Sequence, residues 1–299
     1  MSILKNVAIA GASGNVGSVL LPKLIANGNF NVRVLRRAGS DSVYPDGAEV
    51  VDMDYSSPDS VKAALAGQDA VISLANTTGL DSQIALIDAA VEAGVKRFLP
   101  SEFGCDTENP NARKLPVFAP KIKTHDYLKQ KAATTPLTYT LVFNSAFLDW
   151  GLEQQFIFKT SGETEILDGG DLLFSSTTLG SIADGVIGVL THPEETKNRT
   201  VHIHDVVTSQ NKLLALAKKV APNKEWKTVN VKIDDLIAKA DARLAQHLYD
   251  AETFIPYLFR AIFDPAYGSK FETTDNELLG VKGKTDEDII ELLKPLVSL

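Results

Sequence analysis

The first half of the chain alternates short apolar runs with longer segments of helical periodicity. The apolar runs cover residues 7–10, 31–35, 49–52, 69–74, 97–99 and 137–142. Helical patterns fill the intervals, over residues 15–27, from residue 57, from residue 81 and near residues 118–133. The first run, residues 7–10, is apolar at every position, which is typical of a strand buried on both faces. The pattern therefore predicts an α/β protein built on a doubly wound parallel sheet.

A glycine-rich loop, Gly11-Ala-Ser-Gly-Asn-Val-Gly17, joins the first predicted strand to the first helix. The first glycine permits a tight turn, the second lets the backbone approach a pyrophosphate, and the third allows the helix to pack closely on the strand. The free N–H groups of the helix N-terminus face the phosphates. We therefore expect a dinucleotide cofactor on a Rossmann-type fold. The residues expected to bind it here are Gly11, Ser13, Gly14, Asn15, Val16 and Gly17.

The end of the second predicted strand indicates which dinucleotide is bound. A site for NAD carries an acidic residue there, about 20 residues after the glycine loop, for the ribose 2′-hydroxyl. Here the strand ends in Arg36 and Arg37, and the next acid is Asp41. Guanidinium groups match a 2′-phosphate bidentately, whereas a carboxylate would repel it. The sequence predicts NADP(H), with Arg36 as the favoured contact and Arg37 as the second candidate; a solvated pair that only caps the strand is the alternative.

The regular alternation fades after about residue 145. Residues 233–263 carry apolar side chains at helical spacing, which predicts a helical lobe over the carboxyl edge of the sheet, where such folds bind ligands. We expect an NADP-binding Rossmann domain over residues 1–150 and a smaller α+β substrate-binding lobe over residues 151–299. We also expect this lobe to add a strand near residues 200–205 to the main sheet. The turn-rich stretch 105–113 predicts a loop that could act as a lid.

The composition limits which binding partners and which cellular compartment we expect for this protein. The formal net charge of −8 disfavours nucleic acid and anionic membranes as partners. The single cysteine, Cys105, cannot form an intrachain disulfide, which suits a reducing compartment, and we expect it to be an inert thiol. His202 and His204 share one strand face, but no third ligand is near, so we predict no metal site. With neither a secretion signal nor an apolar run of about 18 residues, we expect a cytoplasmic protein.

Polar residues at the ends of the later strands are candidates for cofactor contact. Asn76 follows the fourth strand, Ser101 follows the fifth and Asn144 follows the sixth. The carboxyl ends of these strands are where the nicotinamide would lie. Each of the three could equally cap its own loop. Glu102 could contact a ligand, or it could pair with a basic neighbour and hold its loop.

One literal Tyr-x-x-x-Lys match occurs, at Tyr127–Lys131. Short-chain dehydrogenases use this motif for proton exchange, on the helix after the fifth strand. In extended members the lysine lies well before the Thr-x-Leu segment of the sixth strand, and Lys131 is too close to Thr140. Lys121 stands at the right distance, but Val117 occupies the tyrosine position. We therefore interpret the Tyr127 match as fortuitous, and the catalytic lysine as present without its tyrosine.

Two further strings accompany this lysine. Residues 98–104 read Phe-Leu-Pro-Ser-Glu-Phe-Gly, and residues 118–121 read Phe-Ala-Pro-Lys. With these strings and the glycine loop, residues 5–150 resemble the isoflavone-reductase-like branch of the NmrA-like atypical short-chain dehydrogenases. The resemblance implies that Lys121 is the acid/base beside the nicotinamide, and that a hydride of NADPH reduces a phenylpropanoid-type substrate. An amine flanked by Phe118 and Pro120 is also partly desolvated, which eases proton release.

The sequence after the lysine departs from that family. Plant members commonly place arginines there, whereas this chain continues Ile122-Lys-Thr-His125, which leaves the substrate open. His125 could orient a proton relay, but a histidine on the helix surface is the favoured interpretation. We expect a small aromatic or conjugated organic molecule as the substrate, and the chain could form a homodimer. The alternative is an NADP(H)-sensing regulator without turnover, while the missing tyrosine disfavours an epimerase or dehydratase.

Overall fold

The computed structural model describes residues 4–75 and 82–297, and its largest feature is a parallel sheet of seven strands. The strands are β1 (Asn6–Ala10), β2 (Asn31–Arg37), β3 (Ala48–Met53), β4 (Ala70–Ser73), β5 (Arg97–Leu99), β6 (Thr138–Phe143) and β10 (Arg199–His202). Their order is β10-β6-β5-β4-β1-β2-β3, with every neighbouring pair parallel. The order reverses beside β1, which opens a crevice at the carboxyl ends of the strands. This confirms the predicted Rossmann-type doubly wound sheet.

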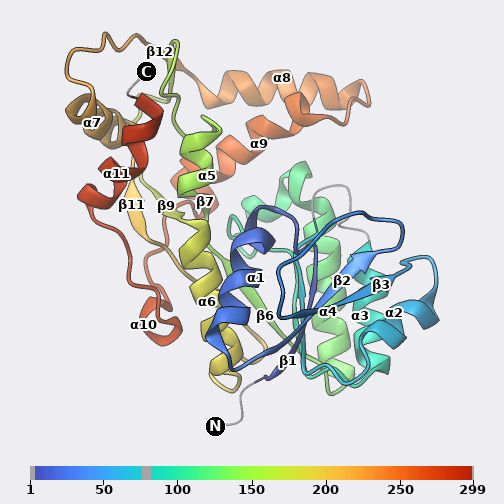
Figure 1. Ribbon diagram of the computed structural model, residues 1–299. Coiled ribbons are helices and arrows are strands. Elements are labelled where there is room, and N and C mark those ends of the chain that lie inside the picture. The colour runs from blue at the N-terminus through green and yellow to red at the C-terminus, as the bar shows by residue number, and fades with distance from the viewer. Residues whose placement is uncertain (1–3, 76–81, 298–299) are drawn as a thin grey trace.

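Helices cover both faces of this sheet (Figure 1). One face carries α1 (Asn15–Asn27) and α6 (Leu179–Thr191), and the other carries α2 (Pro58–Ala64), α3 (Ser82–Glu92) and α4 (Ala119–Thr134). Successive strand residues point to opposite faces of the sheet. Val7 and Ile9 of β1 therefore pack in the core on the side of α1 and α6, while Ala8 and Ala10 pack in the core on the side of α2, α3 and α4. Because both faces of the sheet are covered, the central strands β1 and β4 are buried at nearly every position, whereas the edge strand β3 is largely exposed.

The second half of the chain completes the main sheet. Strand β10 pairs with β6, with Val201 beside Val142, and α6 packs beside α1. Lys23 of α1 donates hydrogen bonds to the Gly180 carbonyl at 2.9 Å and to Asp184 at 2.7 Å, both on α6. The core around the glycine-loop helix therefore contains residues from both sides of residue 150.

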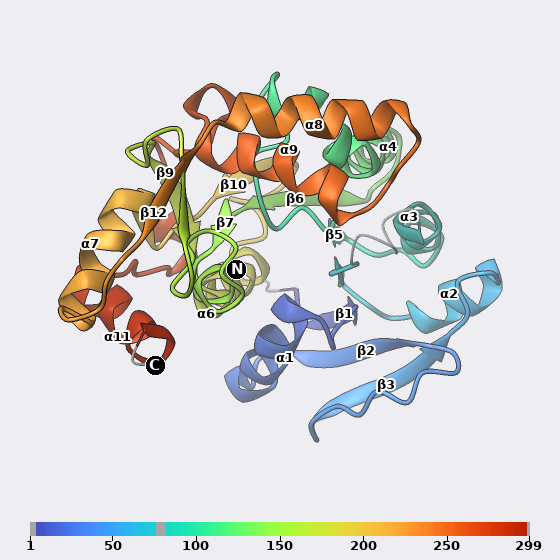
Figure 2. The same cartoon turned by 90° about the horizontal axis from the view of Figure 1, so that it is seen from above.

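Most of the remaining elements form a separate apolar core beside the carboxyl edge of the sheet. Its strands are β7 (Ala146–Phe147), β8 (Thr164–Leu167), β9 (Phe174–Thr177), β11 (Val206–Thr208) and β12 (Thr228–Val231). Its helices are α5 (Leu148–Glu153), α7 (Gln210–Val220), α8 (Ile233–Ala245), α9 (Ala251–Phe263) and α11 (Asp286–Val297). Helix α10 (Asn276–Leu279) instead packs against α6. Figure 2 shows α8 and α9 side by side, extending toward α4. Helix α9 also packs against the short turn Pro116–Phe118, which leads directly into α4.

None of the helices within residues 4–75 and 82–297 is long and apolar enough to cross a bilayer.

Candidate functional site

The glycine loop has the close approaches expected of it. Gly11 has a φ of +83°, and a Cβ at this position would lie 2.5 Å from the Leu74 carbonyl oxygen. A Cβ at Gly17 would lie 2.6 Å from the backbone of Ala12. Both positions therefore require glycine. Because Gly14 is the N-cap of α1, no cap side chain occupies the first N–H groups of the helix, which remain able to bind an anion.

A cavity of about 570 Å³ lies beside this loop. Its lining residues are Ala10, Gly11, Ser13, Gly14, Leu35, Arg37, Ser40, Ser42, Tyr44, Tyr55, Leu74, Ala75 and Ser82. They come from the carboxyl ends of β1, β2 and β4, the loops after β2 and β3, and the start of α3. This is the switch point of the doubly wound sheet, where nucleotides bind in such folds.

The structure separates the two arginines of β2. Arg37 lines the cavity, whereas Arg36 is held by Asp52 of β3, with Nε to Oδ1 at 2.6 Å and Nη2 to Oδ2 at 3.1 Å. Nη1 of Arg36 also donates to the Ser42 carbonyl at 3.3 Å. Arg36, the favoured candidate from the sequence, is thus bound to a carboxylate, and Arg37 is the arginine that lines the cavity.

The sequence did not predict that Ser40, Ser42, Tyr44 and Tyr55 line this cavity. They lie on the loops that leave β2 and β3 at the same edge of the sheet. Tyr55 follows β3 by two residues, so its position just beyond a strand end was the available signal. Burial raises the pKa of the Tyr55 phenol, and the charge of Arg37 opposes that shift.

The other predicted loop residues occupy different positions. Ser13 and Gly14 line the cavity. Val16 is buried in the core under α1, so only its backbone is available to a ligand, and Asn15 is exposed at the first residue of α1. Asn76 lies outside the described residues.

Two hydrogen bonds, made by the neighbouring residues Ser101 and Glu102, link the cavity wall to Lys121. The Ser101 hydroxyl, just after β5, donates to the carbonyl oxygen of Ala75 at 2.7 Å. The next residue, Glu102, accepts a hydrogen bond on its carbonyl oxygen from Lys121 Nζ at 2.5 Å. The cavity and Lys121 are therefore connected along the carboxyl ends of β4 and β5.

Lys121 lies in the first turn of α4, and it is half-buried. Pro120 precedes it, a residue that favours the start of a helix because it needs no N–H partner there. Burial lowers the pKa of Lys121, and the nearby charge of Glu102 opposes that shift. An amine in this setting gives up its proton more readily than a solvated one.

Asn144 ends β6 beside the same segment. Its backbone N–H and that of Ser145 both donate to the Gly104 carbonyl, at 3.1 and 2.9 Å. The Asn144 side chain is fully buried and its amide nitrogen donates to the Ser145 carbonyl, while its Oδ1 has no hydrogen-bond partner among residues 4–75 and 82–297. The carboxyl ends of β5 and β6 are thereby joined next to Lys121.

The literal Tyr-x-x-x-Lys match faces another part of the molecule. The Tyr127 hydroxyl donates to Asp88 of α3 at 2.5 Å, and Lys131 forms an ion pair with the same carboxylate at 2.6 Å. Tyr127 and Asp88 line a shallow depression of about 790 Å³ between α3 and α4, and Lys131 Nζ lies 5.0 Å from the centroid of the Tyr127 ring. Burial and the bond to Asp88 raise the pKa of Tyr127, which is the opposite of what a catalytic phenol needs.

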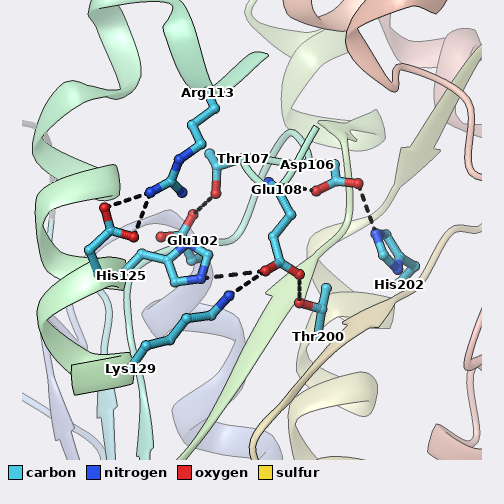
Figure 3. Close-up of polar contacts among 10 residues, drawn as sticks. Glu102, Asp106, Thr107, Glu108, Arg113, His125, Lys129, Thr200 and His202 are labelled. Atoms are coloured by element: carbon cyan, nitrogen blue, oxygen red, sulfur yellow. Dashed lines mark hydrogen bonds and ion pairs between the residues drawn. The ribbon is translucent and has the colours of Figure 1, made fainter. Parts of the chain in front are cut away.

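The expectation that His125 lies on the helix surface is wrong. Its side chain is fully buried, and burial lowers its pKa to about 4, so the imidazole is neutral near pH 7. It is covered by residues 105–113, in which Glu108 Oε1 lies 3.7 Å from His125 Nε2 and binds Lys129 at 2.6 Å (Figure 3). Glu108 also accepts a hydrogen bond from Thr200 of β10. This stretch, expected as a loop, is therefore tied down on both sides.

The remaining sequence candidates have partners inside the fold. His202 lies 3.2 Å from Asp106, as Figure 3 shows, and His204 contacts the Ser175 hydroxyl at 2.9 Å. Cys105 is buried beside Lys121, and burial raises the pKa of its thiol to about 12. The thiol is therefore protonated and unreactive at neutral pH.

The chain resembles known proteins over most of its length. The sequence model of the NmrA-like family matches residues 4–257. The chain is 35% identical to the oxidoreductase aprR of Aspergillus flavus, over 96% of this chain and 98% of that protein. It is 30% identical to the oxidoreductase poxI of Penicillium oxalicum, over 94% of this chain and 91% of that protein. Among solved structures, AtPrR2 with NADP+ and (+)-pinoresinol shares the fold, with a TM-score of 0.80, 22% identity, and coverage of 99% and 100% of the two chains.

Proposed function

This chain belongs to the NmrA-like family, and we propose that it acts as an NADPH-dependent reductase. Its relatives aprR and poxI are oxidoreductases, and AtPrR2, which shares its fold, holds NADP+ and the aromatic compound pinoresinol. The reaction is transfer of a hydride to a small aromatic or conjugated organic substrate, with Lys121 as the acid/base. The proposal rests mainly on the hydrogen bonds of Ser101 and Glu102, which connect the glycine-loop cavity to Lys121 along the carboxyl ends of the strands.

The cofactor fits the cavity by the chemistry of its lining. The N–H groups at the start of α1 suit the pyrophosphate, and Gly11 and Gly17 remove the side chains that would block close approach. Arg37 suits the 2′-phosphate because its guanidinium faces the cavity, while the nearest carboxylate on the adjacent strand, Asp52, is occupied by Arg36. Bound NADPH would supply the hydride.

Lys121 suits the role of proton donor. Addition of a hydride to a conjugated or benzylic carbon leaves negative charge on a neighbouring atom, which must be protonated. A half-buried amine whose pKa is lowered by burial can donate at neutral pH, and the carbonyl oxygen of Glu102 orients it. Ser101 and Asn144 lie on either side of this segment and are the candidates for contacts with the nicotinamide.

The lobe after residue 150 is suited to hold the substrate. Helix α9 packs on the turn that precedes Lys121, and Phe118 of that turn belongs to the same core as Phe174 and Phe263. The turn that leads into Lys121 is therefore anchored in the apolar core of this lobe. A substrate pocket bordered by this core would favour an aromatic molecule and would exclude water from the proton transfer.

A substrate screen tests the proposal. Aromatic enones, phenylpropanoids and imines are offered with NADPH, and the loss of NADPH absorbance is recorded for the wild type and for Lys121→Ala. Turnover by the wild type that is lost in the variant supports the reductase. If no compound is turned over, and the variant binds NADPH and a partner protein as the wild type does, a dinucleotide-sensing regulator is the correct function.

A further inference from the structure

The parallel strands β2 and β3 are joined by two pairs of an arginine and a carboxylate. Arg33 and Glu49 pair at 2.8 Å toward the amino ends of the strands, and Arg36 and Asp52 pair at 2.6 Å toward the carboxyl ends. In each pair the residues stand directly opposite each other in the register of the two strands. The Arg36–Asp52 pair is the one at the end of the sheet where the glycine-loop cavity lies.

Arg36 and Arg37 point to opposite faces of β2. Side chains alternate along a strand, and Leu35 and Arg37 both line the cavity, so Arg36 between them points to the other face of the sheet. Nη1 of Arg36 donates to the carbonyl oxygen of Ser42 at 3.3 Å, and Ser42 lines the cavity. A single guanidinium group therefore stands between the Asp52 carboxylate and a residue of the cavity wall.

Asp52 is charged with or without its partner. Its side chain is 54% exposed, and the bond from Arg36 holds the pKa of the carboxyl below its usual range. Without Arg36 the pKa returns toward the ordinary value of about 3.9, which still leaves the group ionised at neutral pH. A bare carboxylate here would repel a 2′-phosphate, which is an anion, and would act little on the neutral 2′-hydroxyl of NADH.

We infer that Arg36 is a specificity-determining residue, which favours NADP(H) over NAD(H) by masking the Asp52 carboxylate rather than by contacting the cofactor. The inference rests on the proposed use of NADPH. Arg37 supplies the cation that attracts the 2′-phosphate, and Arg36 neutralises the anion that would oppose it. The two neighbouring arginines therefore act on one phosphate in different ways.

Cofactor binding by variants of the ion pair tests the inference. Fluorescence titration in 0.1 M salt gives the dissociation constants of NADPH and NADH for the wild type, Arg36→Ala, Asp52→Asn and the double variant. Arg36→Ala exposes the carboxylate, so NADPH should bind about threefold to tenfold more weakly and NADH should change by less than about twofold. Asp52→Asn should bind NADPH at least as tightly as the wild type. The double variant should recover most of the loss, because the carboxylate that Arg36 masks is gone.

Arg33→Ala is the matched control. It removes an arginine from the same strand and leaves the Glu49 carboxylate without that partner, so the net charge changes by the same amount. Glu49 precedes Asp52 by three residues on β3, which places it about 10 Å farther from the carboxyl edge. That distance is about one Debye length in 0.1 M salt, so both dissociation constants should stay within about twofold of the wild type.

Salt separates the charge effect from loss of the contact with Ser42. In 1 M salt the Debye length falls to about 3 Å, so the ratio of the Arg36→Ala to the wild-type dissociation constant for NADPH should fall toward unity. A displaced loop would keep that ratio high at both salt concentrations.

Three results overturn the inference. The first is a double variant that binds NADPH as weakly as Arg36→Ala does, which indicates that Arg36 contacts the phosphate itself. The second is equal weakening of NADPH and NADH in Arg36→Ala, and the third is no weakening of NADPH at all. Each of these leaves the preference of the wild type for NADPH, and with it the proposed cofactor, intact. Tighter binding of NADH than of NADPH by the wild type contradicts the proposed cofactor itself and the inference that rests on it.

Discussion

Arg36 donates two hydrogen bonds to Asp52 on the neighbouring strand, from Nε at 2.6 Å and from Nη2 at 3.1 Å. The pair lies directly across the parallel register of β2 and β3. This contact neutralises the one carboxylate on β3 that stands level with the end of β2, and it anchors the next loop through the Ser42 carbonyl at 3.3 Å. Arg37 is left as the cation that faces the glycine-loop cavity.

Substitution of Arg37 tests the choice of cofactor. Arg37→Ala should weaken NADPH binding by about 1.5–3 kcal/mol, the range for a hydrogen bond to a charged group, and leave NADH binding nearly unchanged. Fluorescence titration with both cofactors at matched salt measures this. Arg33→Ala is the matched control: Arg33 lies on the same strand, pairs with Glu49 at 2.8 Å and does not line the cavity, so its loss should leave both affinities nearly unchanged. Equal or tighter binding of NADH by the wild type contradicts the assignment of NADP(H).

Tyr127 should be dispensable for turnover. Its hydroxyl is bonded to Asp88 on the solvent side of the helices, and its raised pKa disfavours proton exchange. Tyr127→Phe should therefore retain most of the kcat of the wild type and lose about 1 kcal/mol of stability with the hydrogen bond. Steady-state kinetics and urea unfolding measure the two quantities. Abolished turnover in a folded variant would restore the tyrosine-based mechanism.

Lys121 should control the chemical step rather than cofactor binding. A positioned acid contributes typically about 10²–10⁴-fold, so Lys121→Ala should lower kcat by at least the lower figure. The affinity for NADPH should fall only modestly, because the proposed phosphate contacts, the glycine loop and Arg37, stay in place. Lys121→Arg should not restore the rate, since a guanidinium does not release its proton at working pH. Undiminished turnover in Lys121→Ala shows that another group is the acid.

Arg97 should be a major contributor to stability. It is 2% exposed, and its guanidinium donates to the hydroxyls of Thr138, Thr140 and Thr196 and to the Pro193 carbonyl. Arg97→Met leaves several buried acceptors without a donor, and we expect a loss of about 3 kcal/mol in the free energy of unfolding.

Denaturant unfolding compares Arg97→Met with Lys62→Met, in which an exposed pair with Glu92 at 3.2 Å is removed. The surface variant should change stability by less than about 0.5 kcal/mol. Similar midpoints for the two variants would show that the buried network contributes no more than a surface ion pair.

His125 should make stability depend on pH. In the unfolded chain an imidazole takes up a proton as the pH falls through about 6.5, whereas burial lowers the folded pKa to about 4. The unfolded state binds more protons between these values, so the free energy of unfolding falls as the pH drops from 6.5 to 4.

His125→Phe should remove this component, on the order of 2 kcal/mol between pH 7 and pH 5. Urea unfolding of both proteins at the two pH values measures it, and the other histidines contribute equally to both. Parallel losses in the wild type and the variant would show that His125 titrates as a solvated residue does.

Some of the site could be predicted from short stretches of sequence. The roles of Gly11 and Gly17 were predictable because each depends on the backbone at one turn, where a side chain has no room. The interpretation of the Tyr127 match as fortuitous came from its distance along the chain to the sixth strand, and the bond of its hydroxyl to Asp88 agrees with it. The lining by Tyr44 and Tyr55 was not predicted, because two loops that are separate in sequence meet only when β2 and β3 pair.

The sequence by itself determined the doubly wound parallel sheet and the nucleotide loop, because periodicity and glycine placement are properties of contiguous residues. Only the tertiary structure decided which of Arg36 and Arg37 faces the cavity, since Asp52 captures one of them from the next strand. Only the tertiary structure buried His125, under a stretch fastened to both α4 and β10. The partner of a side chain depends on which segments pack together in space, and a pattern within one short stretch of sequence does not show which segments these are.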